Sequence, residues 1–197
     1  MAIISIYRRI ALKTGKKGWL PDKYSLEEGN KVPGEADANL LYNTDLAEIS
    51  NLAFDRFIEL LRSACEDADP EIDKKFVRFF EKYHILQLLD KLCWEIYNER
   101  RRIDLIALLE VAYKWAAGSD DAVLVKLGIS LMGMLNLDDR EDCRKVIVTL
   151  GKYEEFTLYS LHAISGWDDA DVIASEYAKH LKGWGKTHAE LWGETEW

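Results

Sequence analysis

The amino-acid sequence predicts an all-α fold, and three observations support this prediction. Apolar residues recur at three- and four-residue steps over most of the chain, which places them on one face of a helix. The last of the three prolines is Pro70, so the longer part of the chain contains no residue that breaks a helix interior. Alternating β-branched and polar runs joined by hairpin turns, which would indicate a sheet, do not occur.

The N-terminal part of the chain differs in amino-acid composition from the rest. A short helix is expected first, followed by a long loop or arm over residues 14–44, because this stretch contains Pro21, Pro33 and four of the 12 glycines. Residues 1–35 carry seven basic and four acidic side chains. Such an arm binds an acidic partner or the acidic body of its own chain, and we expect the second, since a modest charge excess is usually a solvated surface. Residues 1–44 are therefore assigned to the helix and the basic arm.

A helical-repeat domain is expected over residues 45–197, and the whole chain is expected to form one compact unit. The first helix of this domain is predicted to begin at Asp45, and the second behind Pro70, which suits the first turn of a helix. Apolar stripes at residues 85–96 and 105–115 predict two more helices. The stripe of the first helix is formed by Leu46, Ile49, Ala53, Phe57, Leu60 and Ala64.

The segment 122–135 is apolar on nearly every side and has Lys126 as its lone charge. A helix of that composition belongs in the middle of a packed layer, and residues 156–164 have a similar character. Gly128 and Gly133 each cost about 1 kcal/mol relative to alanine inside a helix. We therefore expect these two glycines to permit the close approach of neighbouring helices.

The expected helix starts recur at a regular spacing. Aspartate caps the free amide groups of a helix N-terminus. Acidic starts of this kind are Asp69, Asp104, Ser119-Asp120, Asp138-Asp139 and Asp168-Asp169. Equivalent starts are 31 to 34 residues apart, which is the length of two short helices, and such a helix-pair period is typical of an α-solenoid. The sequence therefore predicts a right-handed α-α superhelix of the armadillo/HEAT type, with a plain helical bundle as the alternative.

Two short motifs stand near the C-terminal end of the sequence. Residues 155–159 read EFTLY, and residues 183–186 read GWGK and are followed by His188 and Ala189. This pattern, over about residues 154–192, resembles a group of bacterial HEAT/armadillo-like proteins, in which an EFTLY helix is followed by a helix with GWG, a basic residue and HA. The resemblance covers about a fifth of the chain. It implies an armadillo-like superhelix and brings no activity with it.

Charge and cysteine content argue against several classes of function. The net charge is −9, and 19 of the 26 basic side chains but 31 of the 35 acidic ones follow residue 35. Nucleic-acid binding is disfavoured, because affinity for phosphate backbones is mostly electrostatic, and residues 100–102 form the only dense arginine run. Three cysteines without a CxxC pair predict neither a zinc nor a dithiol site and fit the reducing cytoplasm. No apolar run of about 18 residues occurs, so no membrane contact is expected.

No catalytic residue, metal or cofactor is predicted. The sequence contains no HExxH, GxSxG or GxGxxG motif and no EF-hand loop. A phosphate loop ending at Lys186 would need glycine where His180 stands. A metal site formed by His162, His180 and His188 would require the last two helix pairs to converge, and isolated histidines on helices are far more often ordinary polar residues.

The candidate binding residues lie toward the C-terminal end. They are His162, Trp167, Trp184, Lys186 and His188. Aromatic residues at helix ends can anchor a partner, and they can equally seal the last face of a repeat stack or mediate a homodimer, which we expect of Trp167, Trp184, Trp192 and Trp197. Trp94 and Trp115 fall on apolar stripes instead and are predicted to lie in the core.

The function that these observations favour is that of a non-enzymatic α-solenoid that binds a protein or peptide partner. Fold alone does not fix function, so two alternatives from other classes stay open. One is a HEAT-fold protein that modifies nucleic acid or binds a ligand. The other is an acidic immunity or inhibitor protein that binds a basic toxin through complementary charge.

Overall fold

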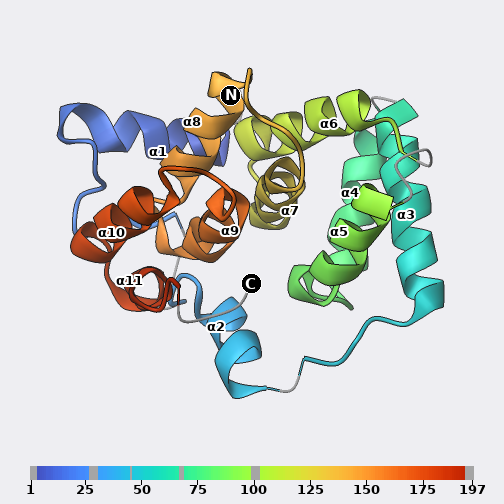
Figure 1. Ribbon diagram of the computed structural model, residues 1–197, viewed down its shortest axis with the longest axis horizontal. Helices are drawn as coiled ribbons and strands as arrows, with labels where there is room; N and C mark the ends of the chain where they lie inside the picture. The colour runs from blue at the N-terminus through green and yellow to red at the C-terminus, as the bar shows by residue number, and fades with distance from the viewer. Residues whose placement is uncertain (1–3, 27–30, 45, 67–68, 99–102, 194–197) are drawn as a thin grey trace.

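The computed structural model describes residues 4–26, 31–44, 46–66, 69–98 and 103–193, and throughout these residues the chain is all-α. Helices account for the regular structure, and the described ranges contain no strand. The predicted all-α class is confirmed. Figure 1 shows the helices in two groups, with α3 (Asn51–Glu66), α4 (Pro70–Phe80) and α5 (Leu89–Asn98) on one side and α8 to α11 on the other.

The N-terminal segment contains more helix than the sequence predicts. α1 (Ile6–Thr14) is the short first helix that the sequence predicts, but the 3-10 turn η1 (Gly15–Lys17) and the helix α2 (Glu35–Asn43) both lie inside the stretch expected to be loop. The sequence of α2 is short and weakly amphipathic, so its pattern does not reveal a helix. The helix depends on contacts with the body, because Asp37 and Ala38 are both buried there.

The arm before α2 docks on the body of the protein. Its contacts use ring faces and backbone groups: the Trp19 indole stacks on His180 with ring centroids 4.4 Å apart, and Lys152 Nζ donates to the Gly18 carbonyl at 2.8 Å. The Leu26 amide donates to the Tyr153 hydroxyl at 3.1 Å. Docking on the chain's own body agrees with the expectation. The ion pair found among the described arm residues is made by an acidic side chain, Asp22, which lies 3.0 Å from Lys182 Nζ.

α3 begins later than the sequence predicts. Residues 46–50 have no regular secondary structure, Asp45 lies outside the described residues, and the Ser50 hydroxyl accepts a hydrogen bond from the Ala53 amide at 3.3 Å. Ile49 is nevertheless buried, so the apolar pattern before residue 51 reflects packing of a segment that is not helical. α4 begins as predicted, with Pro70 in its first turn and the Asp69 carboxylate accepting from the Glu71 amide at 2.9 Å.

The remaining helices follow the expected order with small shifts at their starts. They are the 3-10 turn η2 (Ile85–Gln87), α6 (Leu105–Gly118), α7 (Ala122–Gly133), α8 (Glu141–Leu150), α9 (Glu154–Ile164), α10 (Ala170–His180) and α11 (Gly183–Glu190). Asp104 caps α6 as predicted, but the cap of α7 is Asp121 and the residue before α8 is Arg140, in place of the expected Ser119-Asp120 and Asp138-Asp139.

The core is centred on α7 and α9, as the composition of these helices predicts. Residues 124–132 are all buried in α7, and all of residues 156–164 except His162 are buried in α9. Gly128 lets α6 approach closely, since a Cβ added there would lie 2.6 Å from the Ala112 carbonyl oxygen, and a Cβ at Gly133 would collide with Ala163 of α9. The expected role of the two glycines is therefore confirmed.

From α3 onward, with the exception of α5, consecutive helices pack in pairs. α3 contacts α4, α6 contacts α7, α8 contacts α9, and α10 contacts α11. Between pairs, α3 contacts α6 and α6 contacts α8, while α4, α7, α9 and α11 contact one another in that order. α1 lies against α6 and α8 (Figure 1). α3 and α4 therefore form the first pair in this series of neighbours.

Of the two tryptophans that the sequence predicts to lie in the core, only Trp115 does so. Trp115 is 1% exposed, as predicted, but Trp94 is 58% exposed. In α5, Leu89, Leu92 and Ile96 face the core, so Trp94 lies on the opposite side of that helix. The three cysteines are free thiols.

Candidate functional site

α4 is a strongly amphipathic helix whose outer side is basic. Its buried residues Ile72 and Phe76 face the core, while Lys75, Arg78 and, just after the helix, Lys82 are exposed. The steps of three and four residues from 75 to 78 to 82 place these cations in one line along the helix. None of the three forms an ion pair with a described residue.

A groove of about 540 Å³ runs between this basic line and α3. The α3 side adds Arg56, so four cations border the groove against the single carboxylate of Glu59. The apolar part of the lining consists of Ala53, Leu60, Phe79 and Tyr83. In a chain of net charge −9, this local excess of positive charge beside an apolar floor is the surface with the clearest binding chemistry.

The groove is lined only by α3, α4 and the turn after α4, whereas other residues of this helix pair contact the next pair. On the inner side, Ala64 and Ile72 border a hollow shared with Val111 of α6, and the Phe76 ring meets the Trp115 indole with centroids 4.8 Å apart. The residues of α3 and α4 that line the groove differ from those that border this hollow, and no residue of α6 or α7 lines the groove.

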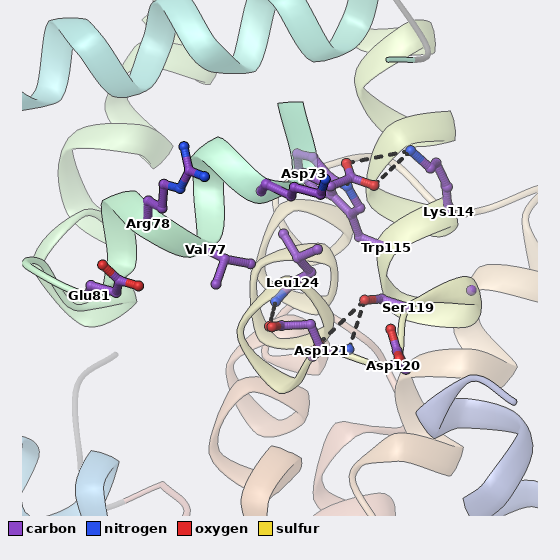
Figure 2. Close-up of a pocket in the computed structure, with 12 residues that line it drawn as sticks. Asp73, Val77, Arg78, Glu81, Lys114, Trp115, Ser119, Asp120, Asp121 and Leu124 are labelled. Atoms are coloured by element: carbon purple, nitrogen blue, oxygen red, sulfur yellow. Dashed lines mark hydrogen bonds and ion pairs between the residues drawn. The ribbon is translucent and has the colours of Figure 1, made fainter. Parts of the chain in front are cut away.

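A second cleft, of about 590 Å³, opens between α4, α6 and the start of α7 (Figure 2). Its polar groups are mostly engaged within the protein: Asp73 accepts from the Trp115 indole at 2.7 Å and from Lys114 at 3.1 Å. Asp121 caps α7 by accepting from the amide groups of Val123 and Leu124. These carboxylates therefore position α6 and α7.

Arg78 is shared by the groove and the cleft. Figure 2 shows its guanidinium rising from α4 away from Trp115 and Asp121, while Val77 and Leu124 face each other across the middle of the cleft. α4 is thus a basic ridge between two hollows, and its cations are accessible from the groove side.

A buried ionic cluster ties α2 to the body. Asp37 on α2 is 1% exposed, and its carboxylate accepts from Lys126 Nζ at 2.8 Å, from the Tyr159 hydroxyl at 2.9 Å and from His84 Nε2 at 2.9 Å. Lys126 also pairs with Glu155. Because His84 Nδ1 accepts from the Leu86 amide at 3.3 Å, the ring hydrogen stands on Nε2 and points at Asp37.

The electrostatics of this cluster keep its main pair ionised. Burial raises the pKa of Asp37, but the hydrogen bond from His84 and the charge of Lys126 outweigh burial and lower that pKa to about 2. Burial lowers the pKa of Lys126, and the charges of Asp37 and Glu155 outweigh it and raise the pKa. Burial beside Asp37 raises the pKa of Tyr159 well above its usual value. The groups are saturated by one another, so the cluster fixes α2 in place.

Trp184 and His188, two of the predicted binding residues, lie together on α11 and face α2. The Tyr42 hydroxyl and His188 Nδ1 are 2.8 Å apart, and the Tyr42 ring stacks on both Trp184 and His188. His188 is fully buried, and burial lowers its pKa to about 4, against an opposing effect of Asp37. This contact holds α2 against α11. Lys186, on the exposed side of α11, reaches Glu190 at 3.5 Å.

The other two predicted binding residues lie elsewhere. Trp167 is covered by the Arg144 guanidinium, whose centre is 3.8 Å from the centroid of the indole ring. His162, on α9, borders a small apolar pocket of about 180 Å³ with Asp90, and burial lowers its pKa. Trp192 donates to Asp171 at 2.8 Å, and Trp197 lies outside the described residues.

The three C-terminal histidines do not converge. His162 lies in the apolar pocket, His180 stacks on Trp19, and His188 pairs with Tyr42. Among the described ranges, no group of three histidine, cysteine, aspartate or glutamate side chains is arranged to hold a metal ion. In the same ranges, no helix has both the length and the apolar character needed to cross a membrane.

The sequence predictions missed the groove of α3 and α4 and the buried position of Asp37. The signal for the groove was present, because Lys75, Arg78 and Lys82 keep helical spacing opposite the apolar stripe of the same helix. No local pattern marks Asp37, whose partners are distant in the sequence. Comparison of the chain with protein-family models, with curated proteins and with solved structures found no match to any of them.

Proposed function

We propose that this chain is a non-enzymatic protein-interaction module built as a right-handed α-solenoid of the armadillo/HEAT type. The order of neighbouring helices supports the solenoid, since each pair contacts the next and α4, α7, α9 and α11 follow one another. The helix-pair spacing of 31 to 34 residues supports it as well.

The observation that carries the proposed function is the groove between α3 and α4. It combines four cations that form no ion pair among the described residues with an apolar floor. In protein interfaces, buried apolar surface contributes most of the affinity, whereas charged residues at the rim orient the partner and increase the rate of association. The first pair of a solenoid also exposes a face that no preceding pair covers, so binding at this end needs no rearrangement of the fold.

Site-specific photo-cross-linking tests this function. A photo-cross-linking amino acid in place of Ser63, an exposed residue that lines the groove, is expected to capture a protein partner in cells that express the chain. The matched control carries the same amino acid in place of Val172, an exposed residue of α10. Adducts at position 172 without adducts at position 63 would show that the partner binds elsewhere.

An acidic immunity or inhibitor protein is the second candidate, and one observation favours it. An ion pair of 3.1 Å between Arg144 of α8 and Asp169 joins α8 to the turn before α10. The connections before these two helices expose Asp138, Asp139 and Asp168. Such an edge complements a basic partner. If the captured partner is basic, and Asp138→Lys with Asp168→Lys abolishes its binding while groove variants do not, this second function replaces the first.

A further inference from the structure

The groove of α3 and α4 has a shape and a charge that specify its occupant. We infer that it binds an acidic amphipathic helix supplied by a partner protein. This inference rests on the proposed function, and it names the chemistry of the partner at the same site. Four features support it, namely the line of cations, the floor beside them, the place of the groove in the helix series, and the sign of the rest of the molecule.

The cations form a linear array of helical dimensions. Lys75, Arg78 and Lys82 span seven residues, which corresponds to about 10 Å along the axis of α4. Arg56 faces them from α3 across the groove. A partner helix with acidic residues at three- and four-residue steps presents carboxylates at the same spacing, so several ion pairs can form at once.

The floor of the groove calls for apolar side chains next to those carboxylates. Leu60, Phe79 and Tyr83 are half-buried, and each would lose more solvent contact under a ligand. A peptide that is acidic on all sides would leave these apolar side chains exposed to water. An amphipathic helix covers it with one stripe and meets the cations with the next, which is the known helix-in-groove mode of recognition.

The position of the groove also favours a helix. Each later pair in the series packs against the pair before it, but α3 and α4 have no helix pair before them. A helix laid between α3 and α4 would cover the outer face of the first pair, as α6 and α7 cover its inner face.

The overall charge favours a short acidic segment over a nucleic acid. The chain carries a net charge of −9, so a long polyanion that extends beyond the four cations meets repulsion. A helix of a partner protein confines its negative charge to the length of the groove. A membrane surface is disfavoured for the same reason.

Fluorescence anisotropy with a synthetic peptide tests this inference on the full chain. The probe is a labelled peptide of about 18 residues, with glutamate and leucine placed at three- and four-residue steps so that a helix carries one acidic and one apolar stripe. The comparison probes are the same peptide with lysine in place of glutamate and a single-stranded oligonucleotide of equal charge. Binding of the acidic peptide is expected to weaken about tenfold on raising NaCl from low to physiological levels.

Charge reversal in the groove provides the decisive variant. The double substitution Arg78→Glu with Lys82→Glu is expected to weaken binding of the acidic peptide by tenfold or more. The matched control is Lys16→Glu with Lys23→Glu in the N-terminal arm, where both side chains are exposed and the change in net charge is identical. All four residues are exposed, and unchanged circular dichroism and thermal unfolding confirm that the variants fold.

A third variant separates the apolar floor from the charges. Leu60→Gln removes apolar surface without altering charge, and it is expected to weaken the acidic amphipathic peptide severalfold. It should leave a purely acidic peptide without leucine unaffected, because that peptide makes no use of the floor.

Other results would overturn the inference. Equal or tighter groove-dependent binding of the oligonucleotide would assign the groove to nucleic acid. A concentration-dependent dimer that Arg78→Glu with Lys82→Glu abolishes would assign it to a second copy of this chain. Failure of the acidic peptide to bind, with photo-cross-linking at position 63 still giving a protein adduct, would refute the acidic helix and leave the proposed function intact. Loss of both signals would refute both.

Discussion

Asp37 and Lys126 are 89 positions apart in the chain, yet the ammonium group of Lys126 lies 2.8 Å from the Asp37 carboxylate in the protein interior. This pair joins α2, in the N-terminal segment, to α7, at the centre of the core. Because α2 is short and weakly amphipathic, its place depends on contacts of this kind rather than on an apolar face of its own.

Removing the cation of this pair should cost far more stability than removing an exposed one. Lys126→Met leaves the buried carboxylate of Asp37 and the partly buried carboxylate of Glu155 without their shared cation, so the free energy of unfolding should fall by about 3 to 5 kcal/mol. Urea unfolding measures this value. Lys179→Met, which breaks an exposed pair with Glu176, should leave the free energy of unfolding almost unchanged. Equal losses in the two variants would contradict the structural role of the cluster.

The buried His188 should make stability depend on pH. Its pKa is about 4 in the folded protein and about 6.5 when unfolded, so the unfolded state binds more protons between these values. Stability from this group is therefore complete above about pH 6.5 and falls as pH drops to about 4, by about 3 kcal/mol. Urea unfolding at several pH values in His188→Gln, which has no titrating ring, should show a flatter dependence. Identical pH profiles for the variant and the parent would show that His188 does not cause the pH dependence of stability.

Close helix approach at Gly133 predicts opposite effects at two glycines. Gly133→Ala forces its new methyl group into Ala163 of α9, and we expect a destabilisation of about 1 to 3 kcal/mol. Gly118→Ala, near the end of α6, meets nothing within 4 Å and should stabilise the protein by up to about 1 kcal/mol. Thermal unfolding of both variants tests the packing of α7 on α9, and a stabilising Gly133→Ala would contradict it.

Trp115 and Trp94, both of which the sequence predicts to lie in the core, should respond differently to substitution by alanine. Trp115→Ala removes a buried ring that packs on Phe76 and donates to Asp73, so a loss of about 3 to 5 kcal/mol is expected. Trp94→Ala removes an exposed ring, and its effect should stay within about 1 kcal/mol. The fluorescence of Trp115 should also be shielded from a soluble quencher, whereas that of Trp94 should not.

The sequence predicted the helical class and the central position of α7 and α9, because an almost uniformly apolar helix has only one place in a helical fold. It predicted the cap at Asp104 and the first-turn position of Pro70 for local chemical reasons. These features depend on residues that are only a few positions apart in the chain, so they can be predicted from the sequence alone.

The features that the sequence did not predict depend on distant partners. Asp37 lies in a stretch whose composition is typical of a loop. Its buried position in a helix depends on contacts with Lys126, His84 and Tyr159, which are distant in the sequence. Trp94 fits an apolar stripe as well as its neighbours do, but the core lies on the other side of α5. His188 was expected to bind a partner, and in the structure the face of α11 that carries it is covered by α2.

The most direct test of the binding account is a charge swap across the groove. The unmodified chain should bind the acidic amphipathic peptide and reject its lysine counterpart, while Arg78→Glu with Lys82→Glu should reject the acidic peptide and gain affinity for the lysine one. Anisotropy titrations of both peptides with both proteins give this comparison. If each peptide binds the two proteins equally well, the cations of α4 do not select the partner, and the assignment of this groove fails.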